Sequence, residues 1–127
     1  MAPHILVVHD DGDVRDVIVE ILLDHGFAAT AATGGVAMRE VLAAGGPPIN
    51  AIVLDSLMPG EPSTALALLA KIVQLPVVMI SGSHECMTFA ADHGLQLLHK
   101  PFRAAELIQA IESAIASGEF GQRPAPP

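Results

Sequence analysis

The chain has 127 residues, 51% of them hydrophobic and 16% charged, which predicts one folded domain and excludes a disordered chain. A single cysteine excludes an intramolecular disulfide and a cysteine-rich zinc site. Fourteen acidic and six basic residues give a net charge of −8, and Trp and Tyr are absent, so we expect no nucleic-acid partner.

Apolar runs and helical patterns alternate along the first half of the chain. Residues 5–8 form a continuous apolar run, typical of a parallel strand buried on both faces. Apolar residues recur at helical spacing over residues 14–22, and Gly26 stands where a helix end favours glycine. A weaker strand over residues 27–31 and a second helix over residues 35–44 follow.

The second half continues the alternation and completes the prediction of the fold. Strands are expected over residues 51–54, 77–80 and 95–99, and helices over residues 63–73, 83–93 and 104–117. The Gly- and Pro-rich residues 118–127 are expected to form a flexible tail after a domain of residues 1–117. Five strands alternating with five helices indicate an α/β fold with a doubly wound parallel sheet.

Four polar residues stand at the carboxyl ends of the predicted strands, where ligands of such sheets bind. They are Asp10, Asp55, Ser81 and Lys100. Two carboxylates suit a hard divalent ion such as Mg²⁺. A carboxylate beside that ion can attack phosphorus to form an aspartyl-phosphate, while a hydroxyl and a lysine bind the phosphoryl oxygens.

Four segments carry a specific pattern: ILVVHDD from Ile5 with Arg15 further on, AIVLDSLMPG from Ala51, PVVMISG from Pro76, and HKPF from His99. In this order they resemble the receiver domains of response regulators, the CheY-like phosphoacceptor modules of two-component signalling. The resemblance covers about residues 4–117. It implies a flavodoxin-like (βα)5 fold with strand order 2-1-3-4-5.

The resemblance makes Asp55 the phosphoacceptor and implies that Asp10, Asp55 and the backbone carbonyl of Leu57 bind Mg²⁺, with Asp11 or His9 as a further candidate ligand. The chain departs from the family because His9 replaces the first residue of the usual acidic pair. The missing carboxylate removes on the order of a few kcal/mol of Coulomb attraction, so we expect weak, pH-sensitive Mg²⁺ binding that improves in His9→Asp. Neutral imidazole suits transition metals better. In the alternative interpretation, His9 is a solvated loop residue without effect on metal binding.

The resemblance also implies the parts that respond to phosphate. Ser81 is the switch hydroxyl, with Gly82 after it, and Lys100 pairs with the phosphoryl group. A cis peptide is expected before Pro101. At the output face, the family's usual aromatic residue is replaced by Leu97, which has no ring to change rotamer.

The leading interpretation is a phosphoacceptor that takes a phosphoryl group from a histidine kinase or a phosphotransfer protein onto Asp55 and switches binding to a downstream protein. It is a signalling module rather than an enzyme, and Leu57 predicts slow loss of the phosphoryl group because its side chain cannot orient water. The alternative is a phosphorylation-independent pseudo-receiver that serves as a scaffold. His9, Leu97 and the unusual residues 60–63 favour this alternative.

No stretch of the sequence has the length and apolarity of a membrane span, and the N-terminal residues lack the pattern of a secretory signal. A soluble cytoplasmic protein, monomeric or weakly dimeric and without membrane contact, is therefore expected.

Overall fold

The computed structural model describes residues 3–46, 48–55, 63–81 and 95–122. Several predicted features lie outside these residues: the helix over residues 83–93, the Leu57 carbonyl, Gly82, residues 60–62 and residues 123–127 of the predicted tail. None of the helices in the described ranges combines the length and apolarity that a membrane span requires.

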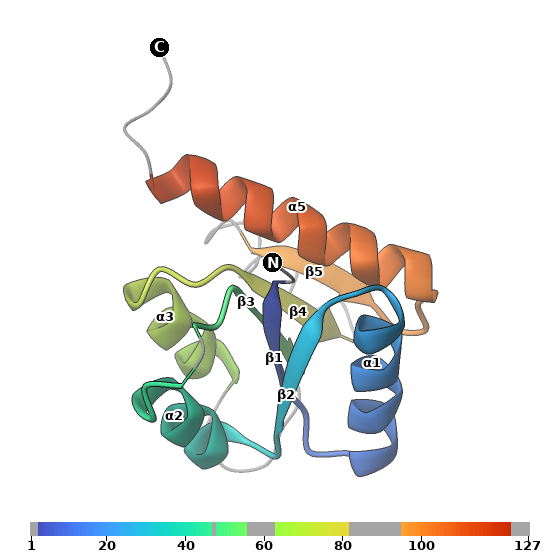
Figure 1. Ribbon diagram of the computed structural model, residues 1–127, viewed down its shortest axis with the longest axis horizontal. Helices are drawn as coiled ribbons and strands as arrows, with labels where there is room; N and C mark the ends of the chain where they lie inside the picture. The colour runs from blue at the N-terminus through green and yellow to red at the C-terminus, as the bar shows by residue number, and fades with distance from the viewer. Residues whose placement is uncertain (1–2, 47, 56–62, 82–94, 123–127) are drawn as a thin grey trace.

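A five-stranded parallel sheet forms the centre of the molecule, in the order β2-β1-β3-β4-β5 (Figure 1). This confirms the predicted α/β class and strand order. The strands are β1 (His4–Val8), β2 (Ala28–Ala32), β3 (Ala51–Asp55), β4 (Val77–Ser81) and β5 (Gln96–His99). The helices are α1 (Gly12–Asp24), α2 (Gly35–Ala43), α3 (Ser63–Ile72) and α5 (Ala104–Gln122).

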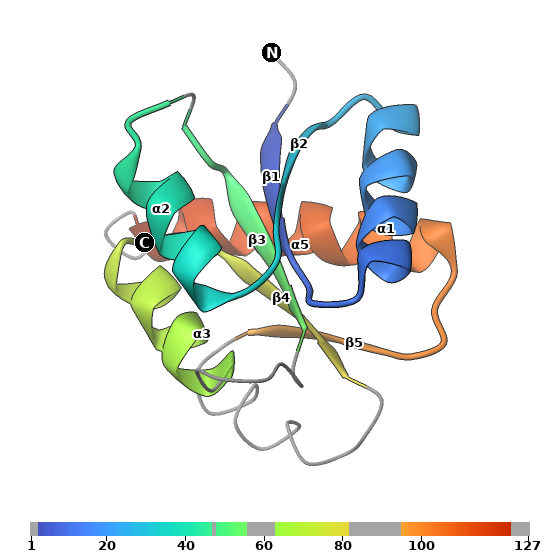
Figure 2. The ribbon, with the colours of Figure 1, turned by 90° about the horizontal axis from the view of Figure 1, so that it is seen from below.

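Helices cover both faces of the sheet, α1 and α5 on one face and α2 and α3 on the other (Figure 2). Alternate residues of a strand point to opposite faces, so Ile5 and Val7 join the core under α1 and α5, while Leu6 and Val8 join the core under α2 and α3. All four side chains are fully buried. Each full burial of such a side chain contributes about 1.5–3 kcal/mol, which explains why the strand reads as a continuous apolar run.

Helix α1 has a defined residue at each end. The Asp11 carboxylate accepts hydrogen bonds from the backbone N–H groups of Asp13 at 2.9 Å and Val14 at 3.2 Å, so Asp11 is the N-cap. At the other end His25 is the C-cap and Gly26 has φ +85°, the left-handed conformation expected there from the sequence.

Most predicted elements differ from the structure by one residue at one end or both, and the end of α5 differs by more. Strand β2 runs from Ala28 to Ala32 instead of over residues 27–31, because the backbone N–H of Phe27 donates to the Leu22 carbonyl near the end of α1 over 3.0 Å. Helix α5 continues to Gln122, so the tail predicted over residues 118–127 is wrong for residues 118–122. The prediction ended the helix at Gly118, but a glycine inside a helix costs only about 1 kcal/mol relative to alanine and does not by itself end it.

Candidate functional site

The carboxyl ends of four strands form one edge of the sheet, and the predicted site residues lie there. His9 and Asp10 follow β1, Asp55 ends β3, Ser81 ends β4, and Lys100 follows β5. The backbone N–H of Lys100 donates a hydrogen bond of 2.8 Å to the Ser81 carbonyl, which ties the ends of β4 and β5 together. The peptide bond before Pro101 is cis, as the resemblance implied.

The Asp55 carboxylate is the central group of this edge. Its residue is only 3% exposed, and a buried carboxylate requires polar partners. The Lys100 ammonium lies 3.5 Å from Oδ1, and the His9 Nε2 atom lies 3.4 Å from Oδ2. Ser81, on the neighbouring strand, is fully buried. Asp55 therefore presents its carboxylate between a cationic side chain and an imidazole.

His9 is a buried residue of the site, with an exposed fraction of 3%. The backbone N–H of Asp11 donates to the ring at Nδ1 over 3.1 Å, and on the other side of the ring Nε2 lies 3.4 Å from Asp55 Oδ2 and 3.5 Å from the Lys100 Nζ atom. The Arg15 guanidinium donates a hydrogen bond of 2.8 Å to the His9 carbonyl and holds the backbone of this loop. His9 is therefore buried and not a solvated loop residue, while its effect on metal binding stays a prediction.

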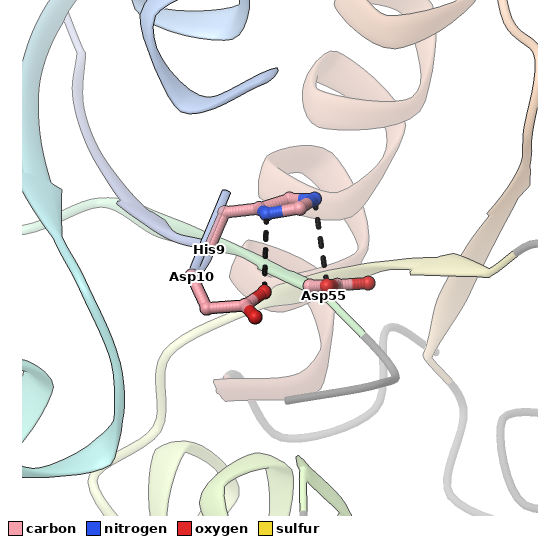
Figure 3. A group of neighbouring side chains, drawn as sticks. All are labelled: His9, Asp10 and Asp55. Atoms are coloured by element: carbon pink, nitrogen blue, oxygen red, sulfur yellow. Dashed lines mark ion pairs between the residues drawn. The ribbon is translucent and has the colours of Figure 1, made fainter. Parts of the chain in front are cut away.

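Three side chains converge in a group that can hold a metal ion. One donor atom from each of His9, Asp10 and Asp55 lies within 4.8 Å of the others. Figure 3 shows the imidazole ring beside both carboxylates, with its Nδ1 atom 3.6 Å from Asp10 Oδ1. The Asp10 side chain is 39% exposed, so an ion can reach the group from solvent.

Asp11, the other candidate ligand, does not join this group. Its carboxylate caps α1, and its backbone N–H binds the His9 ring. Of the two alternatives that the sequence left open, the structure therefore brings His9 and not Asp11 beside Asp10 and Asp55. The capping role had a signal in the sequence, because aspartate directly before a helical pattern is a preferred N-cap.

Leu97 lies on β5, opposite Met79 of β4 in the sheet register. It is partly buried and packs against the core cluster under α2 and α3. At this position, where the resemblance implied an aromatic residue in the family, the aliphatic side chain of Leu97 contributes to core packing.

A protein-family model, that of the response regulator receiver domain, matches residues 5–112 of the chain. The matched region includes the site residues at the ends of β1 and β3. The chain belongs to this family. It is a receiver domain, a signalling module of two-component systems.

Proteins similar to this receiver domain are found in several bacteria. The nitrogen assimilation regulatory protein NtrX of Azorhizobium caulinodans is 34% identical over 122 residues, which cover 91% of this chain and 26% of NtrX. Protein PetR of Rhodobacter capsulatus is 32% identical over 119 residues, or 89% of this chain and 48% of PetR. The crystal structure of NtrX from Brucella abortus superposes with a TM-score of 0.81 at 32% identity, covering 96% of this chain and 28% of that one. The receiver domain thus spans about half, or less, of the length of these relatives.

Proposed function

We propose that this receiver domain accepts a phosphoryl group on Asp55 from the phosphohistidine of a histidine kinase or a histidine phosphotransfer protein. The observation that carries the proposal is the Asp55 carboxylate at the end of β3, buried and 3.5 Å from the Lys100 ammonium. A fixed carboxylate beside a cation is suited to attack phosphorus and to stabilise the charge that the phosphoryl group brings.

The transfer exchanges one bond to phosphorus for another. An oxygen of the ionised Asp55 carboxylate forms the new O–P bond, the N–P bond to the donor histidine breaks, and its electron pair returns to the donor nitrogen. The Lys100 ammonium pairs with the phosphoryl oxygens. The Ser81 hydroxyl and the backbone at Gly82 bind the same oxygens and carry the change to neighbouring elements.

The carboxylates of Asp10 and Asp55 would hold Mg²⁺, together with the Leu57 carbonyl. Two carboxylates fit this ion, which binds few protein oxygens and keeps several waters. When bound, it neutralises charge on the phosphoryl oxygens. We expect the binding to be weak because His9 supplies no negative charge where a third carboxylate would add on the order of a few kcal/mol of attraction.

Phosphorylation then switches the affinity for a downstream protein. Leu97 carries no ring that could change rotamer with Ser81, so we expect either a muted switch or a switch that works through loops alone. The direct bond between the Lys100 N–H and the Ser81 carbonyl supports the second alternative, because a shift of either residue displaces the other.

A second candidate function is a scaffold that binds its partner without phosphate. One observation favours it: His9 Nε2 and Lys100 Nζ already lie beside opposite oxygens of the Asp55 carboxylate. An Asp55 that is held in this way can keep the edge of the sheet in one conformation without modification.

Intact-mass measurement after incubation with acetyl phosphate and Mg²⁺ separates the two functions. We expect one phosphoryl adduct on the chain, its absence in Asp55→Asn, and its retention in Asp16→Asn, which removes one exposed carboxylate from α1. The absence of any adduct, with acetyl phosphate and with a phosphorylated phosphotransfer protein, would leave the scaffold as the function.

A further inference from the structure

We propose that His9 makes this site selective for a transition ion of the Zn²⁺, Co²⁺ and Ni²⁺ class over Mg²⁺. The inference deepens the proposed function, on which it rests, by assigning a different class of ion to the Asp55 site. It is carried by the position of the His9 ring, which is buried and directed at the two carboxylates that would hold the ion (Figure 3).

The spacing of the donor atoms suits a shared ion. Two ligands on a tetrahedral ion, each about 2.0–2.1 Å from it, stand about 3.4 Å apart. His9 Nε2 and Asp55 Oδ2 are 3.4 Å apart, so an ion can bind both with little movement of either side chain. Asp10 supplies the second carboxylate of the group.

Coordination through Nε2 places the proton of the neutral ring on Nδ1, the atom that accepts the Asp11 N–H in this structure. That hydrogen bond must break when the ion binds. The Asp10 carboxylate, 3.6 Å from Nδ1, can accept the ring proton after a small movement of its side chain. A ligating histidine whose other N–H faces a carboxylate is the usual arrangement at protein metal sites. The ring thus exchanges the Asp11 N–H for the Asp10 carboxylate as its partner, and the Asp11 N–H has to turn to another acceptor.

The ligand chemistry then favours the transition ion. Mg²⁺ prefers oxygen ligands in octahedral geometry, whereas imidazole nitrogen suits Zn²⁺ and Ni²⁺. Charge adds to this preference. The two carboxylates carry two negative charges, and the Lys100 ammonium, 3.5 Å from Asp55 Oδ1 and 3.5 Å from His9 Nε2, offsets one of them and must move back from Nε2 when an ion binds there. Mg²⁺, which is held mainly by charge, therefore binds weakly here. A transition ion also bonds to the imidazole nitrogen and so depends less on the net charge of the site.

Titration of the unphosphorylated full chain with Co²⁺ and with Mg²⁺ tests the proposal, using calorimetry and the visible absorption of bound Co²⁺. We expect the Kd for Co²⁺ to be at least about 100-fold below that for Mg²⁺. In His9→Asp we expect the Kd for Co²⁺ to rise and the Kd for Mg²⁺ to fall by roughly tenfold or more. The ratio of the two Kd values is then smaller than in the unmodified chain. His9→Asn removes the ring without adding charge and should lose Co²⁺ affinity with no gain for Mg²⁺.

Other histidines are the control for adventitious binding of Co²⁺. His25 lies at the opposite edge of the sheet, at the end of α1, and His25→Gln should bind both ions as the unmodified chain does. Equal Co²⁺ affinity in the unmodified chain, His9→Asp and His9→Asn would overturn the proposal, as would loss of Co²⁺ affinity in His25→Gln. These titrations use no phosphoryl donor. A missing Asp55 adduct therefore contradicts the proposed function alone, and an unchanged ion preference contradicts this inference alone.

Discussion

Asp10 and Asp11 are adjacent, but Asp11 caps α1 whereas Asp10 faces the ion site, and substitutions can separate these two roles. Asp11→Ala removes the acceptor of two N–H groups at the start of α1, those of Asp13 at 2.9 Å and Val14 at 3.2 Å. Loss of such a cap costs 0.5–2 kcal/mol, and we expect about 1 kcal/mol because the cap is exposed to water. For a domain of this size the corresponding fall in Tm is about 3–5 °C.

Urea unfolding measures this loss, with an unchanged m value as the sign that only stability has changed. Asp11→Asn is the matched control, because asparagine caps as well as aspartate but carries no charge. We expect Asp11→Asn to keep the stability of the unmodified chain, and both Asp11 variants to retain Co²⁺ affinity within about fivefold. Asp10→Asn should do the opposite and weaken Co²⁺ binding with little change in stability.

Two results would refute this reasoning. One is a loss of Co²⁺ affinity in Asp11→Asn as large as that in Asp10→Asn, since it would make Asp11 a ligand. The other is equal destabilisation by Asp11→Asn and Asp11→Ala, since the missing cap would then not be the cause.

Three further predictions concern the core, a helix end and the site. Leu107→Ala, in the fully buried face of α5, should lower the free energy of unfolding by about 2–5 kcal/mol, measured by urea unfolding; a loss below about 1 kcal/mol would contradict its place in the core. Gly26 has φ +85°, so Gly26→Ala should lower the free energy of unfolding by about 1–2 kcal/mol in the same assay. Gly34 has an extended φ of 174°, and Gly34→Ala should lower it clearly less. Equal losses in the two variants would show that the left-handed backbone of Gly26 is not the cause. Lys100→Ala should slow phosphorylation of Asp55 by acetyl phosphate by tenfold or more, measured by mass spectrometry over time, and an unchanged rate would exclude the lysine from charge stabilisation.

The apolar strands could be predicted from sequence because they are buried on both faces. In residues 51–54 and 77–80 no polar residue interrupts the run, and the chain turns polar where the sheet ends. The positions of Asp55 and Lys100 at that edge follow directly, because parallel strands place their carboxyl ends together. The topology thus determines which residues meet before any side chain is placed.

The role of His9 could not be predicted in the same way. Its burial depends on the Asp11 N–H, which binds one ring nitrogen, and on Asp55, which lies 46 residues further along the chain and faces the other. Neither contact has a local sequence signal, so a solvated histidine and a ligand were equally compatible with the pattern. The predicted end of α5 was wrong for a different reason: Gly118 lowers helix propensity but does not end the helix.

The connection between β1 and α1 consists of residues 9–11, and each of the three has a contact that its neighbours cannot make. The first side chain is buried against β3, the second faces the ion site, and the third caps the helix. Deleting one residue would bring a capping carboxylate into the site and leave the helix without its cap, and inserting one would move the imidazole away from Asp55. The length of this loop is therefore constrained as strictly as its composition, and changes in ion preference have to arise by substitution within a connection of fixed length.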